Sequence, residues 1–288
     1  MIKYYSMFGK NPDIPFIFFQ KQILINYSIL TKAMITIIGA GPAGSYLAYL
    51  LAKRGKDVII IEEHEKIGYP VQCTGIVTSS IQNFVKLPRN VIANICSKVV
   101  VVSKNNKIEA NTHEIVMWRN KFDEFMADLA LNQGVKILTN HQFLDLNGKY
   151  SIKIKNKGNS KIREIKSDLI IGADGPSSAL AKYVNYNNDS KYYIGMQAKV
   201  KLKMNLNTFE THFGNDFPNF FGWCVPETED TVRLGLGALK NVKDFFYKFL
   251  IKRTGKKEII CWESGLFPIY SPKKLIQKDN IYLIGDAA

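Results

Sequence analysis

The sequence predicts an α/β fold that combines a Rossmann-type dinucleotide-binding domain with an antiparallel β region. Two patterns predict it. A short apolar strand at residues 34–38 runs directly into a glycine-rich turn and a helix. Further along, short strand-like segments follow one another between turn residues, which is typical of antiparallel sheets. With 46% apolar and 22% charged residues, the composition is that of a globular protein and excludes a mainly disordered or disulfide-scaffold chain.

The first βαβ unit carries a dinucleotide-binding fingerprint. Its turn has the spacing GxGxxG and contains Gly39, Gly41, Pro42, Ala43 and Gly44. These glycines allow a tight turn, close approach of the backbone to a pyrophosphate, and helix–strand packing, while the helix N-terminus offers N–H groups to phosphates. The helix is expected to reach about residue 54. The next strand, 58–61, ends in Glu62, which can accept hydrogen bonds from a ribose hydroxyl and disfavours NADP.

Residues 1–33 are expected to be a leader outside the fold, with Met34 opening the first strand. No run approaches the roughly 18–20 apolar residues that cross a bilayer, and the nearest candidate, 14–30, is broken by polar residues and a proline. The alternative is an interfacial membrane anchor that uses Phe16, Phe18 and Phe19.

The charge balance favours an anionic partner. Lys and Arg number 39 against 25 Asp and Glu, a net charge of +14. A phosphate-bearing cofactor, nucleic acid or an anionic membrane would fit, and a general bias toward scattered lysines is the plainer reading. The four cysteines show no CxxC pair, so we expect no metal site and a reducing, cytoplasmic location.

Three further motifs carry a family resemblance. They are GYPVQCTGIV at 68–77, GADGPSS at 172–178 after an apolar strand, and IYLIGDAA at 281–288. Together with the first turn they resemble the FAD-dependent geranylgeranyl reductase family, which includes archaeal digeranylgeranylglycerophospholipid reductases. The resemblance covers 34–288. It implies a p-hydroxybenzoate-hydroxylase-like, Rossmann-type FAD-binding domain with an inserted antiparallel β substrate domain.

The resemblance also implies the cofactor site. The expected FAD-binding residues are Gly39, Gly41, Pro42, Ala43, Gly44, Glu62, Arg119, Asp174, Gly175, Gly285 and Asp286. For Arg119 the alternative is a solvated charge at the start of a helix. For Asp174 the alternative is an ordinary Asp-Gly turn at a strand end.

On the substrate side, the resemblance points to Cys73 and Trp223. Cys73 matches the family cysteine that faces the substrate, where it would act as a weak proton donor or as a small polarisable wall. Residues 221–226 resemble the family motif Tyr-x-Trp-x-Phe-Pro, but Phe221 lacks the hydroxyl and Val225 lacks the ring. The alternative for this segment is an ordinary sheet core with one tryptophan.

The FAD-binding domain is expected to be discontinuous. We assign it 34–90, 115–188 and 276–288, and assign 91–114 and 189–275 to the substrate domain. The other expected elements are a helix after Arg119, a hairpin at 150–166, and four strands at 194–204, 208–214, 220–226 and 231–239 that we expect to form a meander. In the family the chain continues beyond the last motif, so we expect this sequence to be truncated.

The expected function follows from the resemblance. Reduced FAD would deliver hydride to an isoprenoid double bond of a prenyl lipid, with NAD(P)H, ferredoxin or another donor as the reductant. The protein would be cytoplasmic, with peripheral attachment to the inner membrane face as an option and no nucleic acid partner. A flavin-dependent monooxygenase and a non-catalytic FAD-binding fragment are the alternatives.

Overall fold

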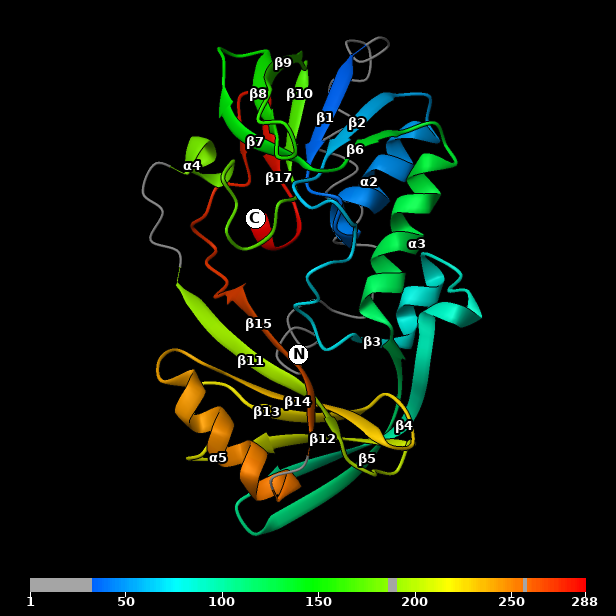
Figure 1. Ribbon diagram of the computed structural model, residues 1–288, viewed down its shortest axis with the longest axis vertical. Coiled ribbons are helices and arrows are strands. Elements are labelled where there is room, and N and C mark those ends of the chain that lie inside the picture. The colour runs from blue at the N-terminus through cyan, green and yellow to red at the C-terminus, as the bar shows by residue number, and fades with distance from the viewer. Residues whose placement is uncertain (1–32, 186–190, 256–257) are drawn as a thin grey trace.

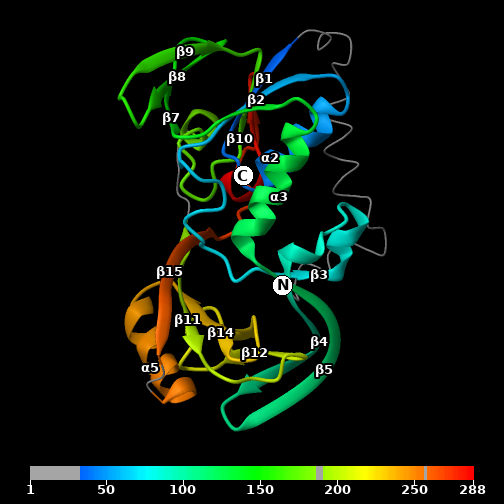
Figure 2. The same cartoon turned by 45° about the vertical axis from the view of Figure 1, so that its right-hand side comes forward.

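The computed structural model describes residues 33–185, 191–255 and 258–288. The expected leader, 1–33, therefore lies outside the described residues except for Ala33. Two sheets dominate the structure and lie one above the other in Figure 1, joined by β4 and β5 on one side and by β11 and β15 on the other. Figure 2 shows the same two layers after a 45° turn about the vertical axis, which brings α3 forward.

The upper sheet has six strands and is parallel except at one edge, where β16 runs antiparallel to β17. In spatial order its strands are β16 (Gln277–Lys278), β17 (Ile281–Leu283), β10 (Leu169–Gly172), β1 (Met34–Ile38), β2 (Asp57–Ile61) and β6 (Lys136–Leu138). Because β1 continues to β2 on one side while β10 lies on its other side, the strand order reverses at β1. Ligands bind at such a reversal, outside the carboxyl ends of the strands.

The register of this sheet brings four chain segments to one edge. Ile38, at the end of β1, lies opposite both Ile61 of β2 and Gly172 of β10, and Gly172 lies opposite Leu283 of β17. The segments that begin at 39, 62, 173 and 284 therefore leave the sheet side by side. All four expected nucleotide-binding motifs meet at this edge.

Both faces of the upper sheet are covered. On one face, α2 (Pro42–Ala52) packs Leu47 and Ala48 against the strands and lies beside α3 (Arg119–Leu131). On the other face, a three-stranded sheet and α4 (Ala181–Val184) contribute a second apolar cluster around Ile152 and Leu180. The strands of that small sheet are β7 (His141–Leu146), β8 (Ser151–Asn156) and β9 (Ile162–Lys166).

The lower sheet has eight strands. In spatial order they are β15 (Ile259–Pro268), β11 (Tyr192–Lys201), β14 (Thr231–Ala238), β13 (Gly222–Pro226), β12 (Thr208–Phe213), β4 (Ile92–Ser103), β5 (Asn106–Met117) and β3 (Ile76–Thr78). The helix α5 (Val242–Thr254) packs Phe246, Phe249 and Leu250 on one face. The opposite face looks toward the upper domain (Figure 1). Short 3₁₀ turns occur at Ser79–Asn83, Arg89–Val91 and Gly285–Ala287.

The structure confirms most expected elements and corrects two. The helices after Gly41 and at Arg119 and the 150–166 hairpin are present. The four later strands do not form a simple meander, because β11 pairs with β14 and β15, while β12 pairs in parallel with β4. The helix α5 was not predicted, although Phe246, Phe249 and Leu250 have helical spacing. Among the described residues, no helix has the length and apolar character needed to cross a membrane.

Candidate functional site

A cavity of about 710 Å³ opens at the carboxyl edge of the upper sheet. Its volume falls within the range of small-molecule and cofactor sites. Five kinds of segment line it: the loops that follow β1, β2, β10 and β17; the segment 68–73; residues of α3; His141, Gln142 and Phe143 of β7; and Leu266 and Phe267 of β15. The cavity therefore lies between the carboxyl edge of the upper sheet and strand β15 of the lower sheet.

The first turn is shaped for close approach of a ligand. Gly39 has φ +105°, and a Cβ atom there would lie 2.4 Å from the carbonyl oxygen of Ala173. A Cβ atom on Gly44 would lie 2.1 Å from the Gly39 oxygen, so Gly44 is required by internal packing and lies behind the cavity lining. At Gly41, by contrast, a Cβ atom would meet nothing within 4 Å. Open space at Gly41 is what a bound pyrophosphate needs.

The start of α2 supplies the phosphate-binding groups. Gly41 is the N-cap and Pro42 the first helical residue, with no side-chain cap and no acidic residue in the first turn. The N–H groups of such a first turn have no partner within the helix and carry the positive end of the helix dipole. Pro42 and Ala43 both line the cavity. This helix start therefore offers an anion site directly at the cavity.

Glu62 is fixed before any ligand arrives. Its Oε2 accepts a hydrogen bond from the Ala40 N–H at 2.8 Å, and its Oε1 accepts one from the His64 N–H at 2.8 Å. The His64 ring nitrogen Nδ1 lies 2.7 Å from the same Oε1. Because a carboxylate has about four lone-pair sites, acceptor capacity remains for ribose hydroxyls. His64 lines the cavity and was not predicted, although it lies only two residues beyond the acidic residue of the motif.

Asp174 and Gly175 form the turn after β10. The Oδ2 atom of Asp174 accepts the Ala179 N–H at 2.8 Å, while its Oδ1 is buried without a hydrogen-bond partner among the described residues. Burial raises the pKa of Asp174, and the hydrogen bonds that it accepts offset part of the rise. A Cβ atom on Gly175 would meet nothing within 4 Å. An orphaned acceptor beside open space fits a ligand that carries hydroxyl groups.

Gly285 and Asp286 follow β17. They complete the group of loops after β1, β2, β10 and β17 that we call the nucleotide cradle. Gly285 has φ +61°, and a Cβ atom there would lie 3.1 Å from the Cβ of Ala43, so this loop lies against the start of α2. Asp286 lines the cavity, and removal from water raises its pKa, while the positive charge of Arg119 acts in the opposite direction. The loop therefore places a carboxylate between the phosphate-binding turn and Arg119.

Arg119 faces the cavity instead of the solvent. Its Nε donates to Asp123 Oδ1 at 2.6 Å, one helical turn along α3, and both side chains are mostly buried. Burial alone would lower the pKa of Arg119, but Cys73 and Asp123 beside the guanidinium outweigh it and raise the pKa above its ordinary value. The solvated-charge interpretation of Arg119 is therefore wrong. Asp123, which the sequence analysis missed, holds it in place.

Cys73 lines the cavity within a segment that has no regular secondary structure. Its Sγ accepts the Gly75 N–H at 3.4 Å, and the Gly75 carbonyl accepts the Met117 N–H at 2.8 Å. A Cβ atom on Gly75 would lie 2.5 Å from the Met117 oxygen, so only glycine fits there. This contact attaches the Cys73 segment to the end of β5.

Trp223 lies on β13 and does not line the cavity. Its Nε1 donates to Gln197 Oε1 at 3.2 Å, and that oxygen also accepts the Thr74 hydroxyl at 2.9 Å. Trp223 therefore reaches the Cys73 segment through Gln197. Its ring lies over Gly235, where a Cβ atom would be 2.6 Å from the indole.

Aromatic rings extend the cavity wall across the lower sheet. Phe267 lines the cavity, and its ring centroid lies 5.0 Å from that of Phe220 and 5.9 Å from that of Tyr193. Phe220 in turn stacks on Phe221 at 4.4 Å. Phe267 and Leu266 give the cavity an apolar wall on the side of the lower sheet, and the other rings pack against Phe267 outside the cavity lining.

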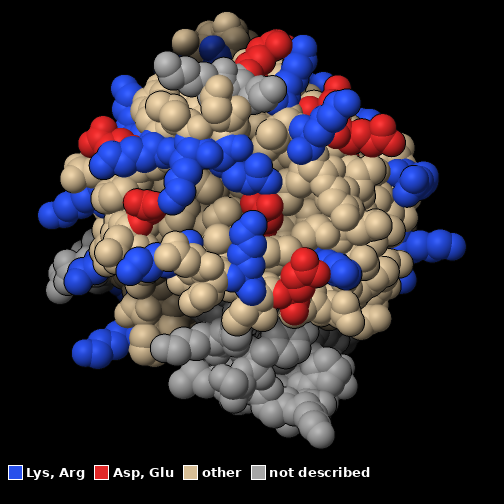
Figure 3. Space-filling model, turned by 90° about the horizontal axis from the view of Figure 1, so that it is seen from below, with Lys and Arg blue, Asp and Glu red and all other residues tan. Residues whose placement is uncertain are grey.

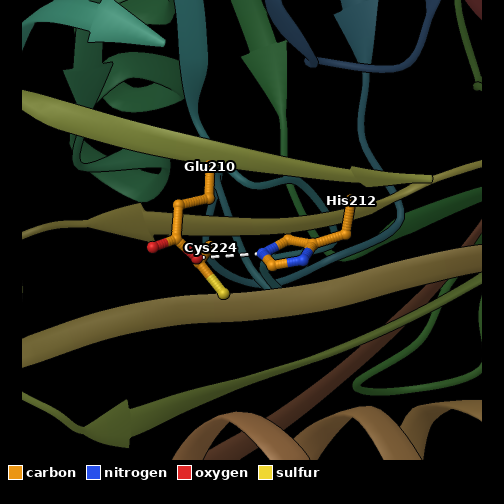
Figure 4. A group of neighbouring side chains, drawn as sticks. All are labelled: Glu210, His212 and Cys224. Carbon is orange, nitrogen blue, oxygen red and sulfur yellow. Dashed lines mark hydrogen bonds and ion pairs between the residues drawn. The ribbon is translucent and has the colours of Figure 1, made fainter. Parts of the chain in front are cut away.

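A separate cluster of Glu210, His212 and Cys224 brings three metal-ligand atoms within 4.8 Å of one another on the lower sheet (Figure 4). His212 Nε2 lies 2.9 Å from Glu210 Oε2. The Arg253 guanidinium engages both carboxylate oxygens, at 3.0 and 2.9 Å. Burial raises the pKa of Glu210, but these two partners outweigh it and lower the pKa to about 2. With a fixed cation already bound to the carboxylate, we interpret the cluster as an ion-pair network.

The comparisons agree with this geometry. A family model described as an FAD binding domain matches residues 32–221, and the chain belongs to that family. Digeranylgeranylglycerophospholipid reductase 3 of Methanosphaera stadtmanae is 28% identical over 281 residues, which cover 88% of this chain and 70% of the relative.

Solved structures share the fold. A geranylgeranyl bacteriochlorophyll reductase-like protein of Thermoplasma acidophilum superposes with a TM-score of 0.80 at 24% identity, over 89% of this chain and 71% of that one. A flavin-dependent halogenase superposes with a TM-score of 0.70 at 18% identity, over 90% of this chain and 54% of that one.

The residues present fit FAD, the cofactor of this family. Open space at Gly41 and Gly175, the orphaned Oδ1 of Asp174 and the free first turn of α2 are the groups that a flavin dinucleotide would use. The class of protein is therefore an FAD-binding flavoprotein with a Rossmann-type fold. Among the relatives that it matches are proteins named as reductases.

Proposed function

We propose that this protein is an FAD-dependent oxidoreductase that saturates isoprenoid double bonds of a prenyl lipid. The observation that carries the proposal is that Cys73 and the ring of Phe267 share one cavity with the nucleotide cradle. The name of the Methanosphaera relative, a digeranylgeranylglycerophospholipid reductase, supports the substrate class.

The protein's task in this reaction is to bind, orient and exclude water. Reduced FAD supplies the hydride when it is bound. Glu62 and the start of α2 would hold the adenosine and pyrophosphate parts, and Arg119 and Asp286 would contact the middle of the cofactor. The apolar wall around Phe267 would accept the hydrocarbon chain.

Cys73 has two possible roles at this wall. It would donate the proton that the second alkene carbon requires, or it would serve as a small polarisable surface beside the substrate. Its thiol lies at the cavity, where it accepts a weak N–H contact from Gly75 and lies beside the Arg119 guanidinium. The two roles predict different losses of activity when Cys73 is substituted.

We propose a cytoplasmic protein that meets its substrate at a membrane surface. The net charge of +14 favours anionic headgroups. Figure 3 shows Lys and Arg spread over the end of the molecule that carries the lower sheet, with Asp and Glu among them. Sedimentation with vesicles of anionic or neutral phospholipid tests this: binding to neither would contradict it.

We also retain the proposed division into an FAD-binding domain at 34–90, 115–188 and 276–288 and a substrate domain at 91–114 and 189–275. The pairing of β1, β10 and β17 in one sheet supports the discontinuous first domain. Limited proteolysis tests the boundaries, because exposed linkers are cut first.

The decisive experiment is product analysis under anaerobic conditions. Purified protein loaded with FAD is reduced with dithionite and mixed with a geranylgeranyl phospholipid, and the lipid is analysed by mass spectrometry for added hydrogen. NAD(P)H and reduced ferredoxin are then tested as electron donors. Oxygen-dependent NAD(P)H consumption with an aromatic substrate would instead indicate a monooxygenase. FAD binding without any turnover would indicate a non-catalytic fragment.

A further inference from the structure

A row of side chains crosses the lower sheet on the face that meets the Cys73 segment. Gln197 of β11 lies directly opposite Glu263 of β15 and Gly235 of β14, and Gly235 lies opposite Trp223 of β13. The alternate residues of these strands point the other way and form the apolar core with α5. Polar groups on the row therefore face the upper domain because of strand register.

Arg233 lies on this face and is 6% exposed. Its Nε and Nη2 contact Glu227 Oε1 at 2.9 and 2.7 Å, and its Nη1 makes a short contact with Glu263 Oε2. The ammonium group of Lys199 lies 3.0 Å from the other oxygen of Glu227, so two cations balance two carboxylates. A guanidinium held by two carboxylates has little freedom to move.

The same guanidinium reaches the loop that carries Cys73, residues 70–74. Arg233 Nη1 donates to the main-chain carbonyl of Cys73 at 3.4 Å. Residues 70–74 belong to no helix or strand, so contacts of this kind determine where their backbone lies. The Arg233 contact comes from a different domain layer, more than a hundred residues along the chain.

Gln197 forms a second connection between the row and the loop. Its Nε2 donates to Glu263 Oε2 at 2.6 Å, which orients the amide so that Oε1 faces the donors. That oxygen accepts from Thr74, beside Cys73, and from the indole of Trp223. The loop is thus tied to the sheet at two successive residues.

We propose that Arg233, held by Glu227 and Glu263, is a positioning residue that fixes the main chain of Cys73, with Gln197 as its partner at Thr74. The effect of this positioning on catalysis rests on the proposed function. The position of the Cys73 main chain rests on the hydrogen bonds alone. Buried ion pairs add little net stability compared with apolar replacements, so a positioning role explains their presence on this face better than a stabilising one.

The test measures the reactivity of the Cys73 thiol in the FAD-loaded protein. Cys96 and Cys224 are buried, whereas Cys261 is exposed, so a Cys261→Ser background leaves Cys73 as the accessible thiol among the described cysteines. In that background, Arg233→Met and Thr74→Val are compared with the parent for the rate of iodoacetamide alkylation, with the modified residue identified by peptide mass spectrometry. Loss of a hydrogen bond from a charged donor corresponds to roughly a tenfold change in loop opening, and the rate should rise by about that factor in Arg233→Met.

Arg253→Met is the matched control. Arg253 also forms a partly buried ion pair in the lower sheet region, but its partner is Glu210 of β12, whereas Arg233 also donates to the Cys73 carbonyl. Positioning predicts faster alkylation in Arg233→Met and Thr74→Val, an intermediate rate in Arg233→Lys and the parent rate in Arg253→Met. Equal rates in all variants, or the same rise in Arg253→Met, would overturn the proposal.

Two further outcomes are distinguishable. If Arg233→Met fails to fold because two carboxylates are left unpaired, Thr74→Val decides alone, since it removes one hydroxyl and leaves every charge in place. If alkylation responds as predicted but no prenyl lipid is reduced, the positioning role stands and the proposed substrate falls.

Discussion

The carboxylate of Glu62 accepts a hydrogen bond from the main-chain N–H of Ala40 at 2.8 Å, and so joins the end of β2 to the glycine turn after β1. The contact orients the acidic residue of the motif without any ligand. A site organised in this way loses less conformational freedom when the cofactor binds.

Replacing Glu62 with Gln should therefore weaken both the turn and the cofactor site. The amide offers one acceptor oxygen where the carboxylate offers two, so either the Ala40 or the His64 N–H is left unpaired. We expect a loss of about 1–3 kcal/mol in the free energy of unfolding and roughly tenfold weaker FAD binding. Urea unfolding and FAD titration measure both quantities. Glu65→Gln, at an exposed neighbour outside the cavity lining, should change neither.

Two glycines of the same turn should respond differently to valine. At Gly41 the new side chain would enter open space, so Gly41→Val should fold and bind FAD at least a hundredfold more weakly, since it fills the place of the pyrophosphate. At Gly44 a Cβ atom meets the Gly39 oxygen at 2.1 Å, so Gly44→Val should fail to fold. Circular dichroism separates the two effects. Unchanged FAD affinity in folded Gly41→Val would contradict the placement of the pyrophosphate at this turn.

Substitution of Cys73 distinguishes its two possible roles. Cys73→Ala should leave FAD binding intact, because the adenosine half contacts other residues. A general acid typically raises a reaction rate by about 10²–10⁴-fold. A loss of that size in the rate of prenyl reduction would identify Cys73 as the proton donor. A loss of only a few-fold would indicate that the thiol is a polarisable surface beside the substrate. Cys261→Ala, at an exposed position, is the control. Loss of FAD from Cys73→Ala would mean that this segment has another role.

Trp223→Ala tests the indirect connection to the loop. Trp223 does not line the cavity but donates to Gln197, which also holds Thr74. We expect FAD binding to persist, and the rate of prenyl reduction to fall. An unchanged rate would show that the tryptophan only packs against Gly235.

Glu210 gives a prediction about pH. Its pKa is about 2 in the folded protein against an ordinary value of 4.5, so its stabilisation is fully present above pH 4.5 and is lost as the pH falls toward 2. Glu210→Gln should therefore lower the free energy of unfolding by about 2–4 kcal/mol at neutral pH, and the difference from wild type should shrink between pH 4.5 and 2. Urea unfolding at a series of pH values measures this.

The matched control for Glu210 is Asp216→Asn. Asp216 pairs with Lys252 at 3.1 Å on the surface, where both side chains are more than half exposed. Exposed pairs contribute about 0–1 kcal/mol, so its difference from wild type should be small at every pH. A difference for Glu210→Gln that does not change with pH would contradict the role assigned to Arg253 and His212.

The sequence was most informative where function depends on local backbone geometry. Gly39, Gly41 and Gly44 lie within one turn, and Glu62 lies at the end of the next strand, so spacing alone places them at one edge of a parallel sheet. The roles of Asp174 and Gly285 could be predicted only from the family resemblance. No local sequence pattern shows that β10 and β17 lie beside β1 in one sheet, in the order β17, β10, β1.

The contacts between the two sheets were beyond sequence reasoning. Arg233 meets Cys73 across 160 residues, and Gln197 meets Thr74 across 123, through a strand order that the expected meander would not have given. Trp223 was expected beside the flavin because of its motif. In the structure the aromatic side chain of the lower sheet that lines the cavity is Phe267, and no motif marks it.

The most direct test of the central claim is anaerobic stopped-flow reoxidation of the reduced flavin. Reduced, FAD-loaded protein is mixed with a geranylgeranyl phospholipid or with its fully saturated analogue, and flavin absorbance is followed. The account predicts reoxidation that depends on the concentration of the unsaturated lipid and none with the saturated lipid. Flavin that stays reduced with both lipids but is reoxidised rapidly by oxygen would contradict it.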